Sequence, residues 1–140
     1  MPSYFDEKVK EAKRAGAANP YAVARAIETR HLMKEALEGW KPSAEAAAAA
    51  REGLRLLFEG HGGRGLRDET VSWAMLIEKR TKIPHARLRV MAAWFARHAV
   101  DRRPGWSNPP TPGYVAWLLW GGEPAARHVT RAIYGRAFAV

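Results

Sequence analysis

The chain has 140 residues, contains no cysteine, and carries 23 Lys and Arg against 14 Asp and Glu. This length predicts one domain with a real hydrophobic core, and the lack of cysteine excludes disulfide bonds and cysteine-ligated zinc. No apolar run approaches the roughly 18 residues of a membrane span, and the first residues do not form a signal peptide. We therefore expect a cytosolic or virion-internal protein with no membrane partner.

The positive charge is uneven along the chain. Residues 1–60 hold 10 basic and 9 acidic side chains, whereas residues 61–140 hold 13 and 5. Concentrated positive charge attracts polyanions at long range, which indicates nucleic acid as a partner. The alternative is a soluble domain with Arg as its default polar residue, because 16 Arg against 7 Lys and the absence of Gln also fit a GC-rich genome or a thermophilic source.

The first 42 residues predict an N-terminal helical segment. A short amphipathic helix is expected over residues 5–15, and Asn19 and Pro20 predict the start of a second one. The turn residues at 39–42 break it. A basic helical domain is expected over residues 43–140, and the two parts are expected to form one structural unit.

The second part begins with a long central helix. Ser43 and a run of five alanines predict a helix over residues 43–59, whose small side chains let a neighbouring helix approach closely. The stretch Gly60-His-Gly-Gly-Arg-Gly65 follows. No strand precedes it and no Gly-Lys-Ser/Thr follows it, so we interpret it as a mobile hinge rather than a phosphate-binding loop.

Four further helices are expected. One covers residues 69–80, is capped by Asp68 or Thr70, and is apolar enough for burial on several sides. The others cover residues 84–100, 114–120 and 124–136, with a Pro/Gly-rich link at 103–113. No strand is expected. The prediction is an all-α, compact bundle of about five to six helices.

The helix at 84–100 organises this bundle. At 100° per residue, its large apolar side chains form one face, and His98 lies at the edge of that face. We expect a core and structural set from this helix and the one at 114–120: Met91, Trp94, Phe95, His98, Asp101, Trp117 and Trp120.

The helices at 69–80 and 84–100 have the outline of a helix-turn-helix, joined by Thr81-Lys-Ile-Pro84. The turn has no glycine and the second helix is unusually apolar, so a buried helical hairpin with solvated arginines is the alternative. If the hairpin binds nucleic acid, the second helix and its flanks supply the candidate side chains: Lys82, Arg87, Arg89, Arg97, Arg102 and Arg103.

The sequence shows no catalytic or metal signature. His98 and Asp101 lie three residues apart, but two ligands without a third make a weak metal site. The five histidines share no ligand spacing. We interpret His98 as a structural residue bonded to Asp101 or to a backbone carbonyl, and we expect no catalytic residue, no metal and no cofactor.

Three motifs carry a resemblance to a known family. Asn19-Pro-Tyr-Ala-Val-Ala24, Ala93-Trp-Phe-Ala-Arg-His-Ala-Val-Asp101 and Ala116-Trp-Leu-Leu-Trp-Gly-Gly122 resemble a small uncharacterised domain of tailed-phage and prophage proteins. The second and third motifs, with the Gly-rich loop and the helical segment before them, extend the resemblance over residues 45–134. The sequence departs from the family in Trp94, where a Phe is usual, and in the Thr81-Lys-Ile-Pro84 turn. The resemblance implies no chemical activity, but it implies a host-cytoplasm or virion location.

Three functions follow as hypotheses. The first is a non-enzymatic, phage-associated basic helical protein that binds nucleic acid through phosphate contacts. The second is a virion structural or head-assembly protein that contacts phage structural proteins, for which Trp106 and the Pro-rich link would offer an exposed arm. The third is a hydrolase or nuclease that uses His98 and Asp101. The oligomeric state is not predicted.

Overall fold

A computed structural model describes residues 10, 23, 25–27, 29–30 and 39–138. The chain divides into two compact units, Met1–Glu38 and Gly39–Val140. The boundary expected after residue 42 therefore stays a prediction, and the helices expected within residues 5–38 lie largely outside the described residues.

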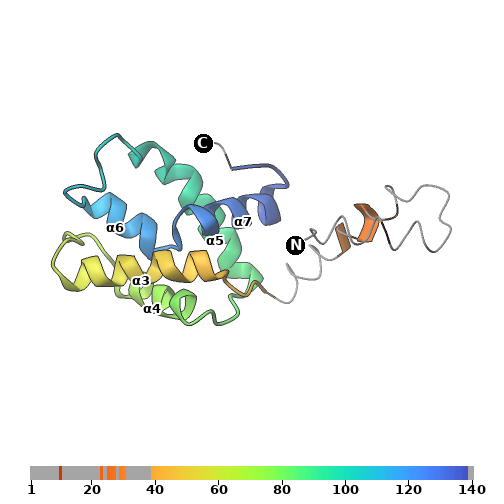
Figure 1. Cartoon of the computed structure of the whole chain (residues 1–140), viewed down its shortest axis with the longest axis horizontal. Coiled ribbons are helices and arrows are strands. Elements are labelled where there is room, and N and C mark those ends of the chain that lie inside the picture. Colours follow the sequence, from red (N-terminus) through yellow and green to blue (C-terminus); the bar gives the residue numbers. More distant parts are fainter. Residues whose placement is uncertain (1–9, 11–22, 24, 28, 31–38, 139–140) are drawn as a thin grey trace. The chain divides into compact units, whose positions relative to one another are not determined.

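The second unit is all-helical (Figure 1), as predicted. Its elements are α3 (Ala44–Phe58), α4 (Asp68–Glu78), α5 (His85–His98), the short 3-10 helix η1 (Ala99–Asp101), α6 (Pro112–Leu119) and α7 (Gly122–Tyr134). Extended backbone pairs only in two isolated bridges among the described residues. Within this described part, no helix is long and apolar enough to cross a membrane.

Helix α3 is central, because it lies between α4 and α6 (Figure 1). The Ser43 hydroxyl caps it by accepting a hydrogen bond from the Ala46 backbone N–H at 3.1 Å. Small residues let α6 approach: a β-carbon at Gly53 would lie 2.8 Å from the backbone nitrogen of Leu119. The prediction of a long, alanine-rich central helix is confirmed.

Helix α4 differs from its prediction. Arg67 occupies the N-cap position and gives no side-chain hydrogen bond, so the expected cap by Asp68 or Thr70 is wrong. The expected burial on several sides is wrong too, because only Ala74 and Ile77 of this helix are buried and Met75 is 43% exposed. Helix α4 packs mainly against α3 and less closely against α6, so much of its surface stays in solvent.

The turn between α4 and α5 directs the two helices to different partners. Ile83 forms a two-bond bridge with Trp40, with N···O distances of 2.7 and 2.8 Å. Helix α4 then packs against α3 and α6, whereas α5 packs against α7. The two helices are consecutive, as a helix-turn-helix requires. Their main contacts, however, are with other helices and not with each other.

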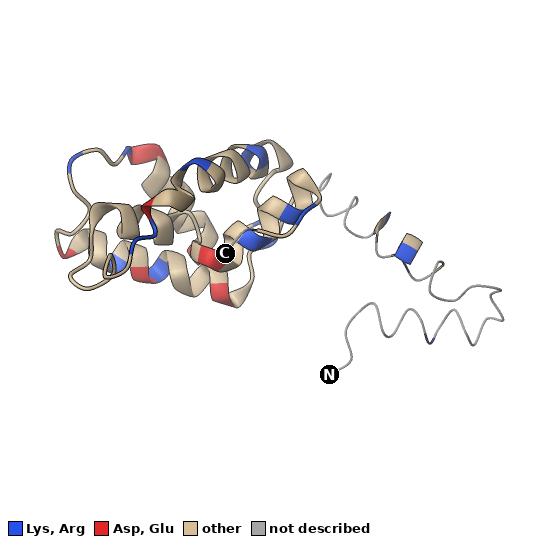
Figure 2. Ribbon diagram, turned by 90° about the horizontal axis from the view of Figure 1, so that it is seen from above, with Lys and Arg blue, Asp and Glu red and all other residues tan. Residues whose placement is uncertain are grey.

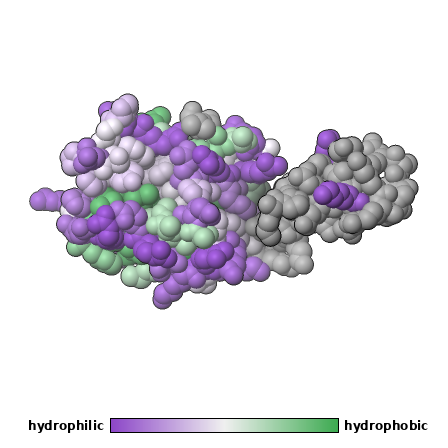
Figure 3. Space-filling view, in the orientation of Figure 1, coloured by the Kyte–Doolittle hydropathy of each residue, from purple (hydrophilic) through white to green (hydrophobic). Residues whose placement is uncertain are grey.

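The main core forms where α5, α6 and α7 meet α3. Met91, Phe95, Trp117 and Trp120 are buried there, whereas Trp94 is half-buried. The link between η1 and α6 folds back on this core. Trp106 packs edge-on against Trp117, with ring centroids 5.8 Å apart, so its side chain is half-buried, whereas residues 103–105 and 107–109 of the same link are exposed. The surface in Figure 3 is mostly hydrophilic, with apolar patches between charged side chains.

Candidate functional site

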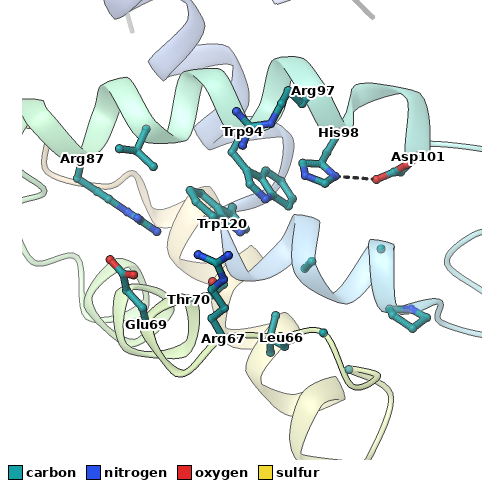
Figure 4. Close-up of a pocket in the computed structure, with 16 residues that line it drawn as sticks. Leu66, Arg67, Glu69, Thr70, Arg87, Trp94, Arg97, His98, Asp101 and Trp120 are labelled. Carbon is teal, nitrogen blue, oxygen red and sulfur yellow. Dashed lines mark hydrogen bonds and ion pairs between the residues drawn. The ribbon is translucent and has the colours of Figure 1, made fainter.

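A cleft of about 580 Å³ opens on one side of the second unit. Its walls are the loop after α3, the first turn of α4, one side of α5, and both ends of α6 (Figure 4). Gly62 and Gly65 of the loop line the cleft, and Trp120 lies in its middle (Figure 4). A cavity of this size lies within the range of small-ligand sites.

Helix α5 places its functional side chains on the cleft by helical spacing. Five residues of α5 line the cleft: Arg87, Val90, Trp94, Arg97 and His98. The first four are three or four residues apart, and His98 follows Arg97 directly, so all five share one side of the helix. On the opposite side of the helix, Leu88, Met91, Ala92 and Phe95 are buried in the core. A single helix thus separates the buried core from a polar and aromatic wall.

Rings and a guanidinium group form one continuous stack along this wall. The guanidinium carbon of Arg87 lies 4.7 Å from the ring of Trp73 and 4.3 Å from that of Trp120. Trp120 stacks on Trp94 at 4.6 Å, and Trp94 stacks on His98 at 4.4 Å. Each group fixes the orientation of the next, so the wall is held in one geometry.

Arg87 is the unusual member of the stack. Its Nε is buried and has no hydrogen-bond partner, and no carboxylate of a described residue pairs with it. Burial lowers the pKa of Arg87, while the nearby charge of Glu69 raises it. A buried cationic donor without a partner is costly in a folded protein. Arg87 also lines the cleft, so its guanidinium is a candidate group for binding an anion there.

Two exposed arginines accompany Arg87. Arg67, at the start of α4, extends toward Trp120, and Arg97 lies beyond Trp94 on α5 (Figure 4). Within the described part of the chain, neither forms an ion pair. The cleft therefore combines three guanidinium groups with two carboxylates, those of Glu69 and Asp101.

The Asp101 carboxylate is occupied by a neighbour. Its Oδ2 lies 2.9 Å from Nδ1 of His98, and both side chains are partly exposed. A carboxylate can only accept, so Nδ1 of His98 donates and Nε2 of a neutral ring keeps a lone pair. A metal site is not formed, because no three His, Asp or Glu side chains cluster among the described residues.

The structure brings two of the six predicted basic residues to the cleft, Arg87 and Arg97. Lys82, Arg89 and Arg103 are exposed elsewhere. Arg102 packs inward: its guanidinium lies over Trp117 and Phe138 and pairs with Glu123 at 3.4 Å. Sequence reasoning missed Arg67 and Glu69, because nothing in the sequence links the first turn of α4 to α5.

Lys and Arg residues are spread over several helices and loops of the second unit rather than gathered on one helix (Figure 2). Positive charge alone therefore does not distinguish the cleft from the rest of the second unit. The buried, unpartnered Nε of Arg87 does. Comparisons of the chain with protein-family models, with curated proteins and with solved structures gave no match.

Proposed function

We propose that this chain is a non-enzymatic protein that binds nucleic acid through phosphate contacts centred on the cleft. The observation that carries the proposal is the convergence of Arg67, Arg87 and Arg97 on one cleft without ion-pair partners. The resemblance of three sequence motifs to a tailed-phage domain supports a phage-associated setting. In this proposal Arg102 has a structural role and is not a contact residue.

Guanidinium groups suit this function for a chemical reason. Arginine presents a planar fork of N–H donors that matches two phosphate oxygens at once, and such contacts release counterions from the nucleic acid. Residues 61–140 carry 13 basic against 5 acidic side chains, which adds long-range attraction.

A pair of double variants tests the proposal. In Arg67→Gln/Arg97→Gln, two cleft charges are lost, and we expect the affinity for DNA and RNA in a mobility-shift titration to fall and the salt slope to drop by about 2. The control, Arg131→Gln/Arg136→Gln, removes the same charge outside the cleft lining. Equal losses in the two variants, or no binding by the unmodified protein at low salt, would contradict the proposal.

The His98–Asp101 contact favours one second candidate, hydrolysis of a phosphodiester. Nε2 of His98 would accept a proton from an attacking water and return it to the leaving oxygen, while the arginines hold the phosphate. His98→Ala should then abolish cleavage of a labelled oligonucleotide and leave binding intact. Cleavage by the unmodified protein would replace the non-enzymatic proposal, and its absence would exclude this candidate.

A further inference from the structure

We infer that the cleft binds the terminal phosphate of a nucleic-acid strand, with Arg87 as the anchoring group. The inference rests on the proposed function and names the part of the ligand that enters the cleft. It follows from three properties of the site: how Arg87 is held, how much charge surrounds it, and how the cleft is enclosed.

Two aromatic contacts restrict the position of the Arg87 guanidinium. The rings of Trp73 and Trp120 lie over the guanidinium at 4.7 and 4.3 Å. Contacts to the faces of a guanidinium leave its N–H donors, which lie in its plane, free for an acceptor in that plane. Two oxygens of one phosphate group provide such an acceptor. The stack thus orients Arg87 before any ligand arrives.

The charge of the cleft suits a phosphate monoester. The cleft lining holds three guanidinium groups, those of Arg67, Arg87 and Arg97, against the two carboxylates of Glu69 and Asp101, so one positive charge is in excess. A phosphate monoester carries a charge of about −1.5 to −2 at neutral pH, whereas a phosphodiester inside a strand carries one negative charge. The surplus of positive charge therefore favours a strand end over an internal phosphate.

The enclosure of the cleft points the same way. Its walls come from four elements, and its volume is about 580 Å³. A space of this size suits one small ligand, such as a single phosphorylated nucleotide, rather than the side of a duplex. Arg67, which is exposed and extends toward Trp120 (Figure 4), would then contact a neighbouring phosphate of the same strand.

The test compares three single-stranded oligonucleotides of one sequence by fluorescence anisotropy at moderate salt. One carries a 5′-phosphate, one a 3′-phosphate and one hydroxyls at both ends, and the label sits within the strand. We expect at least one phosphorylated strand to bind about tenfold more tightly than the hydroxyl strand. Arg87→Lys keeps the charge but loses the fork, and we expect it to remove this preference while weak, salt-dependent binding persists.

Arg89→Lys is the matched control, since it makes the same change on an exposed position of α5 outside the cleft. If Arg87→Lys fails to fold, Arg67→Gln at the exposed rim replaces it, with a partial loss of preference expected. Equal affinity for all three strands would overturn the inference and leave the proposed function standing. No binding of any strand would overturn the proposed function itself.

A competition experiment separates a strand end from a free nucleotide. Nucleoside 5′-monophosphates are added to the complex with the phosphorylated strand. Displacement only at concentrations far above those of the competing strand supports the inference, because Arg67 then contributes a second phosphate contact. Displacement at equal concentrations would show that the cleft prefers free nucleotides, and it would overturn the assignment to a strand.

Discussion

Two arginines of the second unit, Arg102 and Arg87, each lie over two aromatic rings, but only Arg102 has an anionic partner among the described residues. Arg102 lies over Trp117 and Phe138, pairs with Glu123 at 3.4 Å, and donates a hydrogen bond to the Ala99 carbonyl at 3.2 Å. Arg87 lies between two tryptophans, and its Nε has no partner.

The difference separates a structural arginine from a binding arginine. Arg102 satisfies its charge inside the protein, so its energy contributes to folding. Arg87 also contacts two rings, but no carboxylate of a described residue pairs with it. The free energy of such an ion pair would therefore be gained only when an anionic ligand binds. Aromatic contacts alone therefore do not reveal which arginine has a function.

The largest effect is expected at Trp120, on which the position of Arg87 depends. Its side chain is 8% exposed and belongs to the main core while it also covers Arg87. Trp120→Ala should lower the free energy of unfolding by about 3–5 kcal/mol, measured by chemical denaturation. It should also abolish nucleic-acid binding. Trp106→Ala, at a half-buried position outside the cleft, should cost less and keep binding; the reverse order would contradict the packing described here.

Two variants test directly whether Arg102 stabilises the fold and Arg87 binds the ligand. Arg102→Met leaves the charge of Glu123 without its closest partner and should cost roughly 1–3 kcal/mol of stability, with binding retained. Arg87→Met removes a partly buried charge but keeps the length of the stem, so its cost should stay below about 1 kcal/mol while binding is lost. Thermal melts and mobility shifts measure the two effects. Similar stability losses would mean that Arg87 is structural as well.

A smaller change is expected from Glu69, the carboxylate that faces Arg87. Its negative charge raises the pKa of Arg87 and would repel an incoming phosphate. Glu69→Gln should tighten nucleic-acid binding by about two- to fivefold at low salt, and the gain should shrink as salt rises. Glu45→Gln, in the first turn of α3, is the control with the same charge change. Weaker binding in Glu69→Gln would show that this carboxylate takes part in the site.

The smallest effect concerns an exposed ion pair on α3, a third kind of arginine site. Arg55 donates a hydrogen bond to Glu52, which lowers the pKa of that carboxyl below its ordinary value of 4.5. The stability from the pair is therefore complete above pH 4.5 and is lost as the pH falls through the lower folded value. Because solvent screens the pair, Glu52→Gln should cost under about 1 kcal/mol at neutral pH, and thermal melts at low pH should show no difference.

Much of the fold could be predicted from local sequence signals. Ser43, the alanine run and Gly60 bound α3 closely, and Pro104, Pro109 and Pro110 keep the link free of helix up to Thr111. Helix α6 begins at Pro112, two residues before its prediction, because the Thr111 hydroxyl accepts a hydrogen bond from the Tyr114 N–H at 3.2 Å. Such caps depend on a single side chain, which makes helix ends harder to predict than helix cores.

The site was less predictable because it is built from distant parts of the chain. The spacing along α5 shows that Arg87 and Arg97 share one side of the helix. It does not show that the rings of Trp73 and Trp120 contact Arg87. Arg67 joins the site only because α4 and α6 both pack against α3. Arg102 and Arg87 are both predicted to bind nucleic acid. They differ because Arg102 pairs with Glu123 on α7, which the sequence around Arg102 does not reveal.

The stacked indoles also give the cleft an optical property. Trp94 and Trp120 lie 4.6 Å apart with an angle of 10° between their planes, and Arg87 covers the other side of Trp120. Chromophores this close couple their electronic transitions, so the near-ultraviolet circular dichroism of the protein should contain a paired signal from these two rings. An anion that shifts Arg87 would change the environment of Trp120, and occupancy of the cleft could be followed in the unlabelled protein.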